Sequence, residues 1–150
     1  MTAAPAPAME PEHRARLMCL AREVSFPAGT PLFDEGGRAD RFWVVRTGTV
    51  TLDVHVPGRR PTVLDTLGPG DLVGWSWRFP PWIWQAGAAS VTPVRAWEFD
   101  AASVRARCAA DPEFGRGIGL WVGRVVALRL HAARLRLLDL YAADGGGGRL

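Results

Sequence analysis

The chain has 150 residues with a net charge of +3, and its 48% hydrophobic and 22% charged residues are typical of one globular domain. No apolar run approaches the ~20 residues needed to cross a bilayer, and residues 1–9 lack the basic-then-apolar order of a signal peptide. We therefore expect a disordered leader over 1–9, no membrane association and a cytoplasmic location. All 18 basic residues are arginine, but they are spread along the chain, so charge alone does not indicate nucleic-acid binding.

The N-terminal part of the chain changes from a helical to an extended pattern. Residues 10–22 form a predicted short helix, because Pro11 suits a first helical turn and Leu17 and Leu20 supply an apolar face. From Glu23 to Phe99, short extended runs alternate with Gly/Pro turns. Regular short strands at this spacing predict an antiparallel sandwich or barrel of about eight strands. One of them, 49–56, alternates apolar and polar residues, which is typical of a half-buried strand.

Two further helices are predicted after the strands. Asp100 is a candidate N-cap for a short helix over 102–110, and Asp111-Pro112 begins a long helix that we expect to end near Tyr141. The long helix carries an apolar seam at spacings of four and three, which predicts a dimer interface. The seam residues are Trp121, Val125, Leu128, Ala132, Leu135 and Leu138. The domain is therefore predicted over 10–141, with a flexible glycine-rich tail over 142–150.

An ordered set of glycine turns links this α+β pattern to a known family. The stretches are FPAGTPLFDEG, ADRFWVVRTGTVTL and LGPGDLVGW, and their glycines suit tight corners with positive φ. With the long helix that follows, they resemble the cyclic nucleotide-binding domain family, the sensor half of Crp/Fnr-type regulators. The resemblance covers about 24–141 and implies an antiparallel jelly-roll β-barrel with a long C-terminal dimerisation helix.

The segment that would hold a cyclic nucleotide departs from the family pattern. The resemblance implies a glutamate for the ribose and an arginine for the cyclic phosphate. Gly74 is in place, but Trp75 stands where the glutamate is expected, and Trp84 and Gln85 stand near the expected arginine. We therefore do not expect cyclic AMP or cyclic GMP to bind in the usual mode. Arg78 is the candidate to replace the missing phosphate-binding arginine.

Four of the seven tryptophans lie within one ten-residue stretch of this segment, at Trp75, Trp77, Trp82 and Trp84. Three interpretations remain open: the indoles fill the core, line an altered ligand pocket, or form a partner surface. The candidate ligand-binding residues are Gly74, Trp75, Ser76, Trp77, Arg78, Trp84, Gln85 and Ala86.

The remaining motifs narrow the function classes. No catalytic motif and no metal-ligand spacing is recognisable, so no enzyme, cofactor or metal is predicted. Cys19 and Cys108 are far apart, which favours small apolar residues on packed faces over a redox pair. Few residues follow Tyr141, so autonomous DNA binding is not expected. The sequence predicts a stand-alone homodimeric regulatory or protein-interaction module, or alternatively a small-molecule or nucleotide sensor of the Crp/Fnr type with altered specificity.

Overall fold

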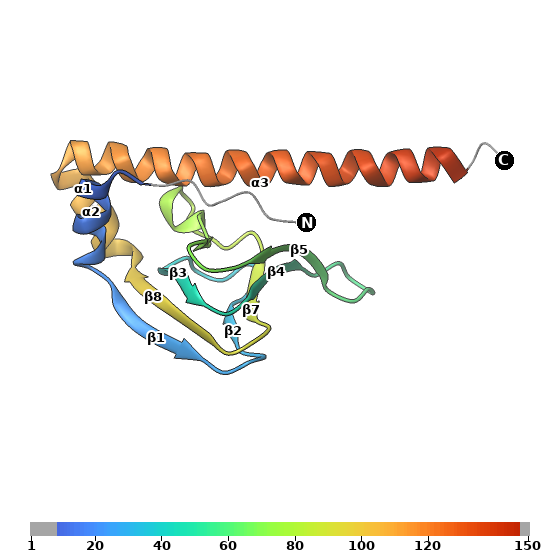
Figure 1. Cartoon of the computed structure of the whole chain (residues 1–150), viewed down its shortest axis with the longest axis horizontal. Helices are drawn as coiled ribbons and strands as arrows, with labels where there is room; N and C mark the ends of the chain where they lie inside the picture. The colour runs from blue at the N-terminus through green and yellow to red at the C-terminus, as the bar shows by residue number, and fades with distance from the viewer. Residues whose placement is uncertain (1–8, 148–150) are drawn as a thin grey trace.

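The computed structural model describes residues 9–147, and it contains two antiparallel sheets beneath one long helix (Figure 1). The elements in chain order are α1 (Pro11–Met18), β1 (Arg22–Phe26), β2 (Pro31–Phe33), β3 (Arg41–Thr47), β4 (Val50–Val54), β5 (Thr62–Leu67), β6 (Leu72–Val73), the short 3-10 helix η1 (Ser76–Arg78), β7 (Gly87–Ser90), β8 (Val94–Asp100), α2 (Ala101–Ala110) and α3 (Pro112–Gly147). The eight strands of the described residues and the helices at both ends confirm the predicted architecture.

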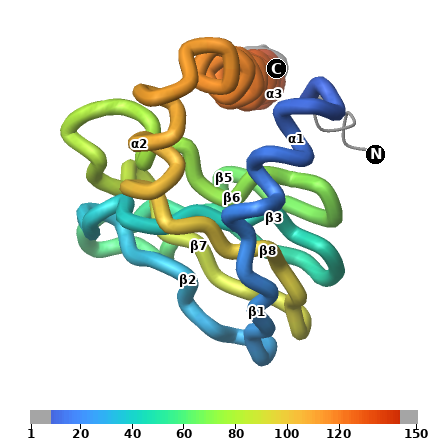
Figure 2. The backbone as a smooth tube through the Cα atoms, turned by 90° about the vertical axis from the view of Figure 1, so that its left-hand side faces the viewer, coloured from blue at the N-terminus to red at the C-terminus, as the bar shows by residue number. Residues whose placement is uncertain are grey.

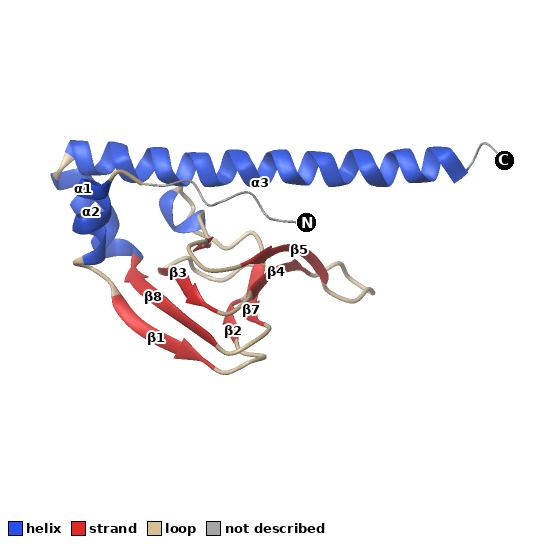
Figure 3. Cartoon of the chain, viewed as in Figure 1, coloured by secondary structure: helices blue, strands red, loops and turns tan. Residues whose placement is uncertain are grey.

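The strands divide equally between two four-stranded sheets. One sheet has the order β1-β8-β3-β6 and the other has the order β2-β7-β4-β5, with every pairing antiparallel. Both sheets lie on the same side of α3 (Figure 3). The expected alternation along 49–56 holds only in part, because β4 ends at Val54 and Val56 is 43% exposed. The chain turns away into the β4–β5 loop before Val56 reaches the sheet.

An aromatic stack forms the centre of the core. Phe42 of β3 lies between Trp77 of η1 and Phe99 of β8, with ring centroids 3.9 Å and 4.8 Å away and nearly parallel rings. All three side chains are fully buried. Because Trp77 belongs to the segment predicted to bind ligand, this stack anchors that segment to the first sheet.

The buried apolar side chains of the long helix α3 lie in its first half. Phe114, Ile118 and Trp121 are buried there, and α1 and α2 lie on either side beneath the helix (Figure 2). The second half extends past the sheets (Figure 1). It continues to Gly147, beyond the end expected near Tyr141, because glycine lowers helix propensity without blocking helical geometry.

The expectations for the chain ends are tested only where the structure describes them. Met9, which we placed in a disordered leader, packs against the core, and the rest of that leader lies outside the described residues. Residues 148–150 of the predicted tail also lie outside them. The N-terminal helix α1 is shorter than predicted, since it ends at Met18 rather than near Arg22.

Candidate functional site

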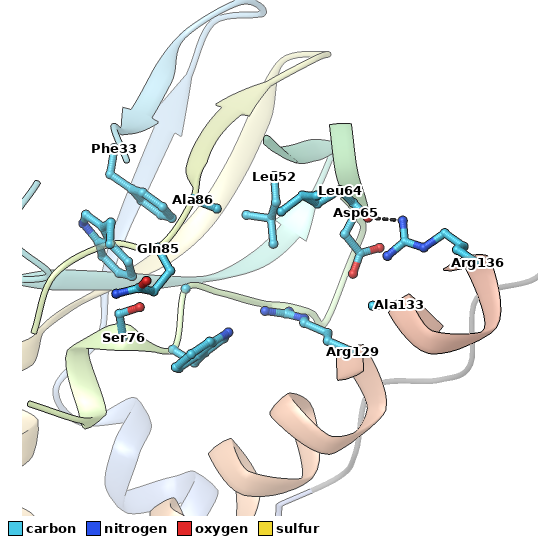
Figure 4. A pocket seen from close by; sticks show the side chains of 13 residues that line it. Phe33, Leu52, Leu64, Asp65, Ser76, Gln85, Ala86, Arg129, Ala133 and Arg136 are labelled. Carbon is cyan, nitrogen blue, oxygen red and sulfur yellow. Dashed lines mark hydrogen bonds between the residues drawn. The ribbon is translucent and has the colours of Figure 1, made fainter. Parts of the chain in front are cut away.

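A pocket of about 220 Å³ lies between the second sheet, the segment 74–86 and the middle of α3. We call it the first pocket. Its lining residues are Phe33, Leu52, Leu64, Asp65, Gly74, Trp75, Ser76, Trp84, Gln85, Ala86, Arg129, Ala133 and Arg136. Figure 4 shows that these residues come from strands of the sheet and from the helix α3. The pocket therefore exists only when α3 lies over the sheet.

One wall of the first pocket is aromatic and depends on Gly74. The rings of Phe33 and Trp84 stack with centroids 3.8 Å apart. Gly74 has a φ of +88°, and a β-carbon there would lie 2.4 Å from the Trp84 ring. Glycine is therefore required for two reasons, the backbone conformation and the space that the indole occupies. The predicted positive φ is also found at the other turn glycines of the resembling stretches, Gly29, Gly36, Gly48 and Gly70.

The opposite wall carries the positive charge. Arg129 of α3 reaches into the first pocket (Figure 4), and its Nη2 donates a hydrogen bond to the carbonyl of Leu72. Its Nη1 is buried and has no hydrogen-bond partner among the described residues. Burial lowers the pKa of Arg129, and the nearby carboxylates of Asp65 and Asp71 oppose that shift. A guanidinium nevertheless stays charged at neutral pH.

A second arginine, two helical turns further along α3, marks the outer edge of the pocket. Arg136 donates a hydrogen bond from Nη1 to the carbonyl of Leu64 on β5. Both arginines thus tie α3 to the strands through backbone carbonyls. Sequence reasoning missed them, although their spacing of seven places both on one face of a helix.

The structure brings six of the eight predicted ligand residues to the first pocket: Gly74, Trp75, Ser76, Trp84, Gln85 and Ala86. It does not bring the other two there. Trp77 is fully buried in the aromatic stack and donates a hydrogen bond from Nε1 to the Gly74 carbonyl at 3.1 Å. Arg78 points away and lines a different pocket.

The four tryptophans of the cluster lie in different environments, so no single one of the three interpretations describes them all. Trp77 is core, Trp84 is a buried pocket wall, and Trp75 is a half-buried pocket wall. Trp82 is 42% exposed and lies on the outer surface. The 3-10 turn and the two prolines that follow it send successive indoles in different directions, which no sequence periodicity indicates.

The seam on α3 is also divided between two environments. Trp121 and Val125 are buried in the core of the chain itself. Leu128, Leu135 and Leu138 are 43–64% exposed, and Ala132 is exposed. Only the later seam residues are therefore free for another chain, because α1, α2 and the sheets already cover the earlier ones.

The two cysteines lie in different environments. Cys108 is half buried as expected, but Cys19 is exposed at the end of α1, contrary to the prediction of a packed face. Among residues 9–147, no group of three metal-ligating side chains comes together. No helix in that part of the chain is long and apolar enough to span a membrane.

These features define a class of fold, a jelly roll of two antiparallel sheets with a pocket beneath a long C-terminal helix. Residues 23–111, more than half of the chain, match the family model for the cyclic nucleotide-binding domain. The chain therefore belongs to the cyclic nucleotide-binding domain family.

Similar proteins support this assignment at several levels. The CRP-like cAMP-activated global transcriptional regulator of Mycobacterium tuberculosis, from strains CDC 1551 and H37Rv, is 32% identical over 139 residues, which are 93% of this chain and 60% of that protein. The chain thus spans about 60% of the length of these curated relatives.

Solved structures show the same fold. The N-terminal domain of a transcriptional regulator from Streptomyces coelicolor A3(2) has a TM-score of 0.65 at 30% identity, covering 83% of this chain and 86% of that one. The Thermus thermophilus catabolite activator protein has a TM-score of 0.68 at 25% identity, covering 88% and 60%. A cyclic nucleotide-binding domain from Methylobacillus flagellatus KT shares the fold with a TM-score of 0.77 at 17% identity, covering 85% and 72%.

Proposed function

We propose that this chain is the non-catalytic sensor module of a CRP-like regulator, and that its first pocket binds a small anionic ligand through Arg129 of α3. The observation that carries the proposal is the buried Nη1 of Arg129, which has no partner among the described residues. A buried guanidinium N–H without an acceptor is costly, and an anion in the pocket would remove that cost. The aromatic wall of Phe33 and Trp84 suits the apolar part of such a ligand.

Cyclic AMP and cyclic GMP do not bind in the usual mode of the family under this proposal. Trp75 has no acceptor for a ribose hydroxyl, because an indole donates only. Gln85 carries no charge, is exposed, and donates a hydrogen bond to its neighbour Ile83 at 3.3 Å. The cationic group comes instead from α3, on the opposite wall of the pocket.

The size of the first pocket limits what it accepts without rearrangement. Its volume of about 220 Å³ is below the ~300–1,000 Å³ usual for pockets that hold drug-sized ligands. A ligand as large as a nucleotide therefore requires Arg129 or Arg136 to leave its backbone carbonyl. Since both arginines belong to α3, ligand entry would loosen the helix from the strands and so transmit the signal.

The second half of α3 is the output surface of the proposed sensor. Its exposed apolar side chains include Leu128, Leu135, Leu138 and Tyr141. We propose that this half pairs with α3 of a second copy in a cytoplasmic homodimer, since four-three spacing is the pattern of helix pairing. A ligand that moves α3 then changes the geometry of the dimer, and a protein partner reads the change.

Inorganic phosphate, cyclic AMP and cyclic GMP are the probes that test the ligand proposal. Thermal unfolding of the full chain is followed with each probe, against chloride at equal ionic strength. Phosphate should raise the melting temperature of the wild type more than that of Arg129→Gln, because the variant keeps the fold but loses the charge. Arg134→Gln, an exposed arginine of the same helix, is the matched control and should respond like the wild type.

Two results would contradict the proposal. An equal phosphate response in the wild type and Arg129→Gln would show that Arg129 does not hold the anion. A large shift with cyclic AMP that survives Arg129→Gln would show that the segment 74–86 still binds cyclic nucleotides without the helix. A ligand at 100 times its dissociation constant contributes about 2.7 kcal/mol, so either result is measurable.

A further inference from the structure

A second pocket, of about 660 Å³, lies on the other side of the segment 74–86, between that segment, α2 and the first turns of α3. Its lining residues are Arg78, Pro80, Trp82, Arg105, Cys108, Ala109, Pro112, Gly115, Arg116 and Gly119. None of them lines the first pocket. The volume falls within the ~300–1,000 Å³ typical of small-molecule sites.

The second pocket concentrates positive charge without a compensating carboxylate. Arg78, Arg105 and Arg116 come from three different elements, and the residues that line the pocket include no acid. No carboxylate forms an ion pair with any of these three arginines within residues 9–147. Three unpaired arginines around one concavity make an electrostatic site for an anion with several charges.

Two acids near these arginines in the chain, Asp100 and Asp111, form hydrogen bonds at helix ends. A third, Glu113, is exposed three residues before Arg116 and forms no ion pair with it. Asp100 accepts hydrogen bonds from the backbone N–H and the hydroxyl of Ser103 as the cap of α2. Asp111 pairs with Arg16 at 2.5 Å and accepts from the Phe114 N–H at the start of α3. Both acids therefore serve helix ends, and neither forms an ion pair with any of the three arginines, although Asp100 is near enough to Arg105 for their charges to attract.

Arg105 is held in place by its surroundings, and Arg78 has a buried N–H that is left unsatisfied within residues 9–147. Arg105 donates a hydrogen bond from Nη1 to the Trp77 carbonyl at 2.7 Å, and its guanidinium lies 4.5 Å from the centre of the Trp82 ring. Arg78 has a buried Nε with no hydrogen-bond partner among the described residues. An oriented guanidinium and a buried N–H without an acceptor are what a bidentate phosphate contact requires.

We propose that this second pocket binds the phosphate chain of a small molecule that carries two or more phosphates. Arg78, Arg105 and Arg116 hold the phosphate oxygens. The ligand is either a nucleoside polyphosphate, whose base would lie against the exposed ring of Trp82, or inorganic polyphosphate. The segment 74–86 contributes to both pockets, so a ligand in the second pocket restricts the movement of one wall of the first pocket. Binding at the second pocket would in this way regulate binding at the first.

Protection of a cysteine measures binding directly. Cys108 lines the second pocket, whereas Cys19 is exposed at the end of α1 and serves as an internal control. Alkylation by iodoacetamide at mildly alkaline pH is followed for both cysteines by peptide mass spectrometry, with ATP or tripolyphosphate added at millimolar concentration. Burial raises the pKa of the Cys108 thiol, so its reaction is slow enough to follow. ATP or tripolyphosphate should slow the alkylation of Cys108 several-fold and leave Cys19 unchanged.

Two arginine variants assign the effect to the pocket. Arg116→Gln should raise the ligand concentration that half protects Cys108 about tenfold, which corresponds to about 1.4 kcal/mol of binding free energy. Arg107→Gln, an exposed arginine of α2 that does not line the pocket, is the matched control and should protect like the wild type. Circular dichroism checks that both variants fold.

The outcomes distinguish the two ligand sources and test the site. Stronger protection by ATP than by tripolyphosphate, lost on Trp82→Ala, supports a nucleoside polyphosphate. Equal protection by the two, unaffected by Trp82→Ala, supports inorganic polyphosphate. The proposal is overturned if neither compound protects Cys108, or if Arg116→Gln and Arg107→Gln behave alike. Protection of Cys108 that persists in Arg129→Gln shows that the second pocket binds its ligand independently of the first. The proposals for the two pockets can therefore fail separately.

Discussion

Replacing Gly74 by alanine should destabilise the fold through the wall of the first pocket. The φ of +88° costs an L-residue about 1–2 kcal/mol. The new β-carbon would lie 2.4 Å and 2.5 Å from two atoms of the Trp84 ring, and such overpacking costs about 1–3 kcal/mol. Alanine also lowers the conformational entropy of the unfolded chain, which offsets about 0.4–1 kcal/mol of this cost. We therefore expect Gly74→Ala to lower the free energy of unfolding by about 2–4 kcal/mol.

Urea unfolding, followed by circular dichroism and by tryptophan emission, measures this loss. Gly123→Ala is the matched control, because Gly123 is an exposed residue of α3 with open space around its α-carbon. That substitution should stabilise the chain by about 0.5–1 kcal/mol, since alanine is the better helix former.

A double-mutant cycle separates the two causes of the loss at Gly74. In the background of Trp84→Phe, the smaller ring should relieve the overpacking and leave the backbone strain, so the cost of Gly74→Ala should fall. The reasoning is refuted if Gly74→Ala is as stable as the wild type, because neither the strain nor the contact would then exist.

Three further substitutions test the core, a helix cap and the proposed dimer. Trp77→Ala should cost about 3–5 kcal/mol in urea unfolding, because it removes one fully buried ring from the end of the aromatic stack. Asp100→Ala should cost about 1 kcal/mol at neutral pH by removing the cap of α2. Hydrogen bonds from the hydroxyl and then the backbone N–H of Ser103 hold the pKa of Asp100 below its usual value of 3.8. The stability that this carboxylate contributes is therefore complete above that value and is lost as the pH falls through the lowered pKa, so wild type and variant should converge in acid. Leu135→Glu should convert a dimer into a monomer in sedimentation equilibrium with unchanged circular dichroism, and a wild type that sediments as a monomer at micromolar concentration would contradict the dimer.

Local chemistry in the sequence determined the element order and the turns. Short strands between Gly/Pro turns, Asp100 before α2 and Pro112 at the start of α3 are recognisable because turns and caps involve only neighbouring residues. Gly48 and Gly74 illustrate the same rule, since both adopt the positive φ that their turns require. The family resemblance depends on this local set, which is why it was visible in one sequence.

Tertiary packing alone decided which side chains form the candidate sites. Arg129 meets the carbonyl of Leu72, 57 residues earlier in the chain, only because α3 folds back over the sheet. Arg78, the substitute arginine suggested by sequence position, faces the second pocket because Trp77 beside it is committed to the core. Side-chain direction in an irregular segment follows the long-range contacts of its neighbours, and these are not encoded in local spacing. The sequence by itself therefore determined the fold family and the order of its elements, while packing determined which side chains line each pocket.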